Sequence, residues 1–243
     1  MTSYPSATKA SSAVLADAAT SDPANSKFEL IYFGIQVRAE IPRLILAYAG
    51  AKVKYTTAEW PAMKQKTRYG SLPALFETTS NGTVLEFAES QAIERYLAKK
   101  FNLLGANAWE EHLVNEYVHG LDCEITNHMK VMFASAEDRQ KEAESFSRDF
   151  GKWIAFIEQH LAANGNNGHF VGDKISWADL KAAVLVRRLT LVWPSACGVE
   201  APKLPESLVR VADTVKADAK VRAWLVSEEH HKFDGNTKGF FKL

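Results

Sequence analysis

The sequence contains few cysteines, since Cys123 and Cys197 are the only two among 243 residues. They form neither a C-x-x-C pair nor a spacing typical of zinc ligands, which argues against a dithiol redox centre and against a metal site. Sparse, unpaired cysteines are typical of a reducing compartment. We therefore expect a cytoplasmic protein that requires no metal.

Charge of one sign is not in excess either, because Lys plus Arg and Asp plus Glu each number 29. Nothing in this balance favours nucleic acid or an anionic membrane surface as a partner. Long apolar runs are missing from the first 27 residues, which are rich in Ser, Ala and Thr. We expect no signal peptide or membrane span there, and we predict that residues 1–27 form a disordered tail.

Apolar material for a buried core is present, since 47% of the residues are hydrophobic. Between residues 28 and 101, strand patterns and helical stripes follow one another. The predicted elements are a strand at 28–33, a helix from Ile41 to Gly50, a strand at 53–56, a hairpin of strands at 72–76 and 83–87, and a helix containing Ile93 and Leu97. This order is typical of a small mixed α/β domain.

Past Phe101 the strand patterns stop. Two long helical stripes follow, one from Trp109 to Met132 and one from Phe146 to Leu161, and we interpret both as bundle core rather than cofactor boxes. Ser176 to Asp179 has the pattern of a capping box that opens a further helix. The predicted fold class is α/β plus all-α, with an N-terminal α/β domain at 28–101 and a helical bundle domain at 109–243.

One stretch carries a binding signal of its own. Pro73 stands at the start of a strand pattern, and if the Leu72–Pro73 bond is cis, the backbone of Leu72 faces outward as an extra strand edge for an extended peptide. Ser90 is placed to cap the next helix, whose N-terminus suits a carboxylate. The alternative is that Pro73 only punctuates a strand and that Ser90 only caps.

A series of short motifs then points to one family. They are, in order, Tyr32-Phe33, Arg38-Ala39-Glu40, Arg43-Leu44, Leu46 to Gly50, Trp60-Pro61 with Lys64, Gly70 with Leu72-Pro73, Glu89-Ser90 with Arg95-Tyr96-Leu97, and Phe170 to Asp173 with Ser176, Ala178 and Asp179. Their order and spacing resemble those of the sigma-class glutathione transferases, and the resemblance spans nearly everything after residue 27.

The resemblance implies that the first domain is thioredoxin-like and holds glutathione, and that the helical domain helps shape the pocket for a second substrate. It implies that Tyr32 donates a hydrogen bond to the glutathione sulfur, with Arg38 as a nearby cation that makes the phenol a better donor. A thiol with a pKa near ~8.5 is mostly protonated at neutral pH, and only the thiolate is a good nucleophile. From the pattern alone Tyr32 reads as a core aromatic, and only the ordered matches give it this role.

The other glutathione contacts that the resemblance implies are Leu72 with Pro73 for the cysteinyl part, Trp60 with Lys64 for the glycyl carboxylate, Glu89 with Ser90 for the γ-glutamyl end, and Asp122 for the glutathione of a partner subunit. The role of Asp122 implies a homodimer. As alternatives, Lys64 is one charge on a solvated loop and Trp60 is a packing anchor. Glu89 stands where many members carry glutamine and Cys123 where a second aspartate often follows, which puts the affinity and any cation site at the dimer interface in question.

Three functions remain open. The first is conjugation of glutathione to small hydrophobic electrophiles, and the second is a glutathione-dependent isomerase or peroxidase activity with the same seat. The third is a non-catalytic ligand carrier or structural protein. Candidates for the electrophile pocket are residues 34–37, the face of Ile125, Met129 and Met132, and Phe240-Phe241. We interpret His112, Glu116 and His119, which share a helix face, as a solvated surface rather than a metal site.

Overall fold

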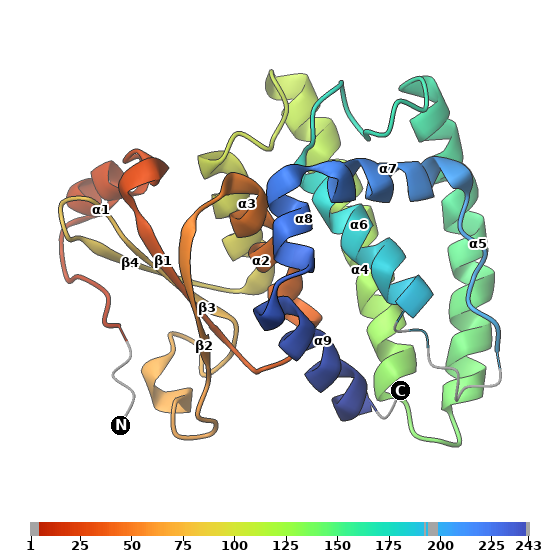
Figure 1. Cartoon of the computed structure of the whole chain (residues 1–243), viewed down its shortest axis with the longest axis horizontal. Helices are drawn as coiled ribbons and strands as arrows, with labels where there is room; N and C mark the ends of the chain where they lie inside the picture. The colour runs from red at the N-terminus through yellow and green to blue at the C-terminus, as the bar shows by residue number, and fades with distance from the viewer. Residues whose placement is uncertain (1–4, 192, 194–198, 242–243) are drawn as a thin grey trace. The chain divides into compact units, whose positions relative to one another are not determined.

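The computed structural model describes residues 5–191, 193 and 199–241 (Figure 1). The chain divides into two compact units. The first unit comprises residues 1–101 and 223–237, and the second unit comprises residues 102–222 and 238–243.

The first unit is built on a sheet with the strand order β2-β1-β3-β4. Its strands are β1 (Lys27–Tyr32), β2 (Lys52–Thr57), β3 (Ala74–Thr78) and β4 (Val84–Ala88). β1 and β2 are parallel, whereas β3 is antiparallel to both β1 and β4. The parallel pair requires a crossover, which the chain supplies with a helix between the two strands.

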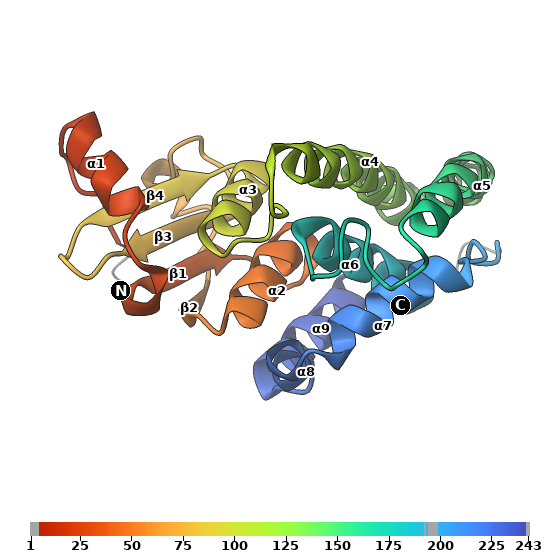
Figure 2. The same cartoon turned by 90° about the horizontal axis from the view of Figure 1, so that it is seen from above.

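Two helices cover this sheet, α2 (Glu40–Ala49) and α3 (Ser90–Lys100). They pack against each other and lie on the same side of the sheet in Figure 2. α2 ends at Gly50, whose φ of 69° gives the left-handed cap that glycine adopts at little cost. A buried cluster of Ile31, Met63, Ala74 and Phe76 fills one part of the core of this unit.

The segment before β1 differs from the disordered tail that its composition predicts. It contains a helix, α1 (Ser12–Ala19), and a 3₁₀ turn, η1 (Pro23–Asn25). The backbone N–H of Thr8 donates to Val84 O at 2.9 Å, so the segment covers part of the exposed edge of β4. Lys100, itself paired with buried Glu77 at 2.7 Å, donates to the carbonyl of Ala19. These contacts are tertiary, so a reading of local composition does not detect them.

The second unit is helical. Its main helices are α4 (Ala108–Phe133), α5 (Arg139–Ala163), α6 (Trp177–Leu191) and α7 (Glu206–Ala217). α4 packs against α5 and α6, and α6 packs against α7. Most of the predicted α4 stripe is core, but Trp109 in the first turn is 66% exposed. The spacing of apolar residues assigns Trp109 to the stripe, but neighbouring helices do not cover this residue at the start of α4.

The chain after α7 does not belong wholly to the helical domain predicted at 109–243. α8 (Ala219–Leu225) ends in the first unit, and most of α9 (Glu228–Phe241) is part of that unit too. The ring of Tyr55 on β2 lies 5.1 Å from that of Trp224 and 6.2 Å from that of Phe233. These aromatic contacts fix the late helices to the sheet unit.

Candidate functional site

The strand register gathers several predicted site residues at one end of the sheet. Ala74, the first residue of β3, pairs with Ile31 on one side and with Ala88 on the other. The chain neighbours of these three residues, at the same end of the sheet, are Tyr32, Pro73 and Glu89. The structure therefore brings together the strand end, the proline turn and the helix start that the sequence singled out separately.

Tyr32 is the last residue of β1, and its side chain is buried. Its hydroxyl oxygen accepts a hydrogen bond from the backbone N–H of Arg38 at 3.4 Å. A hydrogen bond accepted by a phenol oxygen polarises its O–H group, which makes the phenol a better donor. The phenol is therefore chemically able to donate to a sulfur atom.

Two arginines lie near Tyr32, and they differ in burial. The side chain of Arg38 is exposed, and it is the backbone of Arg38 that contacts the hydroxyl. Arg43 on α2 is buried, and its guanidinium carbon lies 6.0 Å from the centroid of the Tyr32 ring. Burial lowers the pKa of Arg43, and Glu40, 3.5 Å away, acts in the opposite direction. The sequence signals for Arg43 are its place in the motif series and a charge amid the apolar stripe of α2.

The turn at Pro73 contains the cis bond on which the predicted peptide-binding edge depends. The Leu72–Pro73 bond is cis, and so is the Trp60–Pro61 bond, which the sequence gave no reason to expect. Leu72 lies outside the ladder that begins at Ala74. Trp60 and Leu72 both pack against the buried cluster around Ile31, next to the turn. Lys64, in the 3₁₀ turn η3 (Lys64–Lys66), is exposed.

The start of α3 has an unusual backbone. Glu89 is the N-cap residue, with φ 67° and ψ 115° and no side-chain capping bond, and it is exposed. Ser90 is the first residue of the helix and does not hold the cap position that the sequence predicted for it. Non-glycine residues rarely adopt positive φ, and such strained residues cluster at ligand sites. The backbone N–H groups and the positive dipole end of α3 suit an anion.

Asp122 belongs to the second unit, on α4. Its Oδ1 lies 2.8 Å from Nζ of Lys181 on α6, and Lys181 is fully buried. Sequence reasoning missed Lys181, which interrupts an otherwise apolar helix face. The ion pair engages the carboxylate that the resemblance assigned to the glutathione of a partner subunit.

The other candidates lie in both units. Residues 34–37 connect β1 to the 3₁₀ turn η2 (Val37–Ala39) in the first unit. In the second unit Ile125 and Met132 are buried, and the ring of Phe133 lies 6.2 Å from that of Phe240 and 5.1 Å from that of Phe241.

The remaining metal and cysteine candidates are on the surface or undescribed. Nε2 of His112 lies 3.2 Å from Glu116 on an exposed face that also carries His119. Within residues 5–191, 193 and 199–241, no group of three or more His, Cys, Asp or Glu could hold a metal. Cys123 is exposed and forms no disulfide with a described residue, and Cys197 lies outside the described residues.

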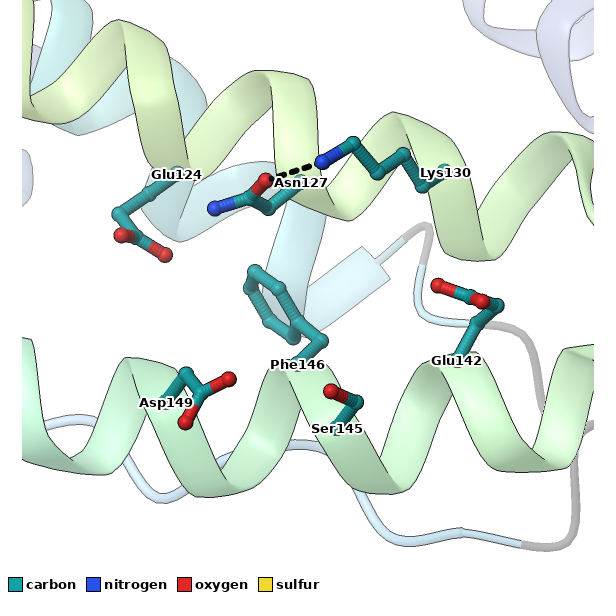
Figure 3. Close-up of a pocket in the computed structure, with 7 residues that line it drawn as sticks. All are labelled: Glu124, Asn127, Lys130, Glu142, Ser145, Phe146 and Asp149. Atoms are coloured by element: carbon teal, nitrogen blue, oxygen red, sulfur yellow. Dashed lines mark hydrogen bonds between the residues drawn. The ribbon is translucent and has the colours of Figure 1, made fainter.

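A cavity of about 150 Å³ lies on the second unit between α4 and α5 (Figure 3). It is lined by Glu124, Asn127, Lys130, Glu142, Ser145, Phe146 and Asp149. Burial raises the pKa of Glu124, and the nearby charge of Asp149 adds to this effect. None of the predicted glutathione-binding residues lines this cavity.

In the part of the chain that is described, no helix is long and apolar enough to span a membrane.

Known structures show which fold class this arrangement defines: a thioredoxin-like domain followed by an all-helical domain, as predicted. A Fasciola hepatica sigma class glutathione transferase superposes with a TM-score of 0.72 at 22% identity, covering 83% of this chain and 96% of that chain. Rat hematopoietic prostaglandin D synthase, solved with a quinoline, gives a TM-score of 0.67 at 26% identity, covering 82% of this chain and 96% of that chain.

Sequence comparisons agree with the fold. The family model described as "Glutathione S-transferase, C-terminal domain" matches residues 124–228. "Probable glutathione S-transferase 7" of Caenorhabditis elegans is 32% identical over 206 residues, covering 82% of this chain and 95% of that protein. "Hematopoietic prostaglandin D synthase" of Rattus norvegicus is 29% identical over 213 residues, covering 84% and 98%. The chain belongs to the glutathione S-transferase family, whose members use glutathione as a co-substrate.

Proposed function

We propose that the protein is a glutathione transferase in which Tyr32 keeps the bound thiol ionised for attack on small hydrophobic electrophiles. The observation that carries this proposal is the buried phenol at the sheet end, whose oxygen accepts the N–H of Arg38 at 3.4 Å. That bond fixes the phenol oxygen and favours donation of its own hydrogen. Hydrogen bonds to a charged acceptor are about twice as strong as neutral ones, so this donor favours the thiolate over the thiol.

We assign each part of glutathione to a different group of residues at this end of the sheet. Leu72 and Pro73 pair with the cysteinyl backbone, while Trp60 and Lys64 hold the glycyl carboxylate. The γ-glutamyl end meets the start of α3, where Glu89 suits the ammonium and Ser90 with the helix N-terminus suits the carboxylate. Holding the tripeptide at three points brings the sulfur to the phenol in a fixed geometry, which converts the reaction with a second bound substrate into an effectively intramolecular step.

The proposal includes a cytoplasmic homodimer. Tyr69 is 66% exposed next to Arg68 on the first unit, whereas the cavity of Figure 3 is acidic and contains Phe146. In a symmetric dimer, the basic Arg68 of one copy is complementary in charge to the acidic cavity of the other copy. In this dimer we assign Asp122, which pairs with Lys181, to the glutathione of the partner subunit. Sedimentation of the purified chain measures the oligomeric state.

A second candidate is a glutathione-dependent isomerase. Two relatives that align over most of this chain, from Rattus norvegicus and Gallus gallus, are named hematopoietic prostaglandin D synthase, and both are 29% identical to it. A peroxidase, and a carrier that retains the fold without turnover, complete the alternatives. Product analysis with an aryl halide, an isomerisable peroxide and an organic hydroperoxide separates them.

Conjugation of a chromogenic aryl halide by wild type and by Tyr32→Phe tests the proposal. A hydrogen bond to a charged group contributes about 1.5–3 kcal/mol, so kcat/KM is expected to fall roughly 10- to 150-fold while glutathione affinity changes little. Tyr48→Phe removes a half-buried phenol on α2 of the same unit and serves as the matched control. Equal turnover by wild type and Tyr32→Phe would remove Tyr32 as the activator, and absence of glutathione binding by wild type would leave only the carrier.

A further inference from the structure

The last turns of α9 contact the loop that follows the strand carrying Tyr32. Nδ2 of Asn236 donates to the carbonyl of Gly34 at 2.7 Å. The hydroxyl oxygen of Thr237 accepts the backbone N–H of Gln36 at 2.9 Å. Both contacts lie inside the first unit, and each joins residues about two hundred positions apart. α9 therefore holds the backbone of residues 34–36 at two successive points.

This loop determines where the Arg38 N–H points. It runs from Tyr32 into η2, and the N–H at its far end reaches the Tyr32 hydroxyl. Between them Val37 has a φ of 36°, which is rare for a β-branched residue and persists only where the surroundings enforce it. Gln36 and Thr237 are both buried, so their contact is shielded from water.

α9 is itself fixed to α2 through buried groups. Nε2 of His230 lies 3.3 Å from Oε1 of Glu40, and the guanidinium carbon of Arg43 lies 3.8 Å from the centroid of the Phe233 ring. His230, Glu40 and Arg43 are each at most 3% exposed. Because the charges of Glu40 and Arg43 are buried, a shift of the helix would remove contacts that offset their desolvation, which is costly. The helix is thus a rigid support rather than a loose tail.

We propose that Thr237 and Asn236 are positioning residues for the thiolate site: from α9 they fix loop 34–36 so that the Arg38 N–H stays aimed at the Tyr32 phenol. This inference rests on the proposed function of Tyr32. It assigns to the C-terminal helix a part in activating glutathione, exerted through the loop and without contact to the substrate.

The test compares Thr237→Val, which removes the acceptor, with Thr237→Ser, which keeps it. Thr214→Val is the matched control, because Thr214 on α7 of the second unit also donates to the carbonyl four residues earlier. A neutral hydrogen bond contributes about 0.5–1.5 kcal/mol, so we expect kcat/KM of Thr237→Val at neutral pH to fall about two- to tenfold. The pH profile should move toward higher pH, glutathione affinity should stay near wild type, and Thr237→Ser should restore the profile.

Amide hydrogen exchange of residues 34–39 provides a readout that does not depend on activity, and it should accelerate in Thr237→Val and in Asn236→Ala. Asn236 is exposed, so Asn236→Ala carries the test if Thr237→Val does not fold. An unchanged pH profile with unchanged exchange in the folded variants overturns the inference, as does failure of Thr237→Ser to restore the wild-type profile. A wild-type protein that binds glutathione without ionising it overturns the proposed function instead, and the exchange data then still report whether α9 holds the loop.

Discussion

Two residues beside the sheet end, Val37 and Glu89, have positive φ angles of 36° and 67°. Each such conformation costs on the order of 1–3 kcal/mol for a non-glycine residue. Val37 leads to the N–H that contacts Tyr32, and Glu89 opens the helix proposed to hold the γ-glutamyl end. Strained residues thus precede the Arg38 N–H and the start of α3, the two backbone features of the proposed glutathione site.

Replacement of Glu89 by glycine separates stability from binding. Glu89→Gly should raise the free energy of unfolding by about 1 kcal/mol, because glycine relieves the strain at positive φ and returns only part of it through its greater chain entropy. It should weaken glutathione binding, because the carboxylate proposed to contact the γ-glutamyl ammonium is lost. Urea unfolding and calorimetric titration with glutathione measure the two effects.

Glu89→Ala is the control for this pair of effects, since alanine loses the carboxylate but keeps the strained backbone. Weaker binding without a gain in stability is expected for it. Equal stability of the glycine and alanine variants would show that the backbone at Glu89 is not strained.

For single residues, the sequence predicted which ones lie at the sheet end better than it predicted what each one contacts. The ordered motifs located Tyr32, Pro73 and Glu89, and the register then placed all three at one sheet end. They did not predict that the backbone of Arg38 contacts the Tyr32 hydroxyl while Arg43 is the buried arginine near its ring, because the direction of a side chain after a strand end depends on the loop that follows.

At the scale of elements, an ion pair joins α4 to α6 and uses the carboxylate of Asp122, which the resemblance assigned to the glutathione of a partner subunit. Asp122 on α4 pairs with fully buried Lys181 on α6 at 2.8 Å. Loss of one partner of a buried pair leaves the other charge uncompensated, which is more costly than the pair is stabilising.

Asp122→Asn should therefore lower the free energy of unfolding by about 3 kcal/mol, as measured by urea denaturation. Adding Lys181→Met to this variant should recover most of the loss, because the buried charge is then removed with its partner. A single substitution that costs nothing would contradict a stabilising role for this ion pair.

Element order was largely predictable, whereas the two ends of the chain were not. Apolar periodicity located the four strands and the long helices, since those segments bury their own faces. α1 and the segment 223–237 are stabilised by contacts with distant parts of the first unit, such as Thr8 with Val84 and Trp224 with Tyr55. Neither contact leaves a local pattern, and so the predicted disordered tail and the predicted domain boundary both differ from the structure.

At the scale of the whole molecule, one buried histidine couples stability to pH. Burial lowers the pKa of His128 on α4 from 6.5 to about 3, and the charge of Arg188 acts in the same direction. Among the described residues, neither of its ring nitrogens has a hydrogen-bond partner. Between these two pKa values the unfolded chain binds a proton that the folded chain does not, so stability falls as pH falls through this window.

The expected loss from His128 is about 2 kcal/mol between pH ~6.5 and pH ~5, at roughly 1.4 kcal/mol per pH unit. His128→Phe should flatten the stability profile by this amount, because phenylalanine fills the site between Phe146 and Trp193 without a titratable group. Urea unfolding of both proteins at the two pH values measures the difference. A variant with the wild-type slope would assign the acid sensitivity to other groups.

The central claim is that a bound sulfhydryl is held ionised by the phenol of Tyr32. Ultraviolet difference titration of the glutathione complex measures its thiolate fraction against pH, in wild type and in Tyr32→Phe. The account predicts a bound-thiol pKa at least about one unit below the free value of ~8.5 in wild type, and a return toward that value in the variant. Coincident titration curves for the two proteins would contradict it.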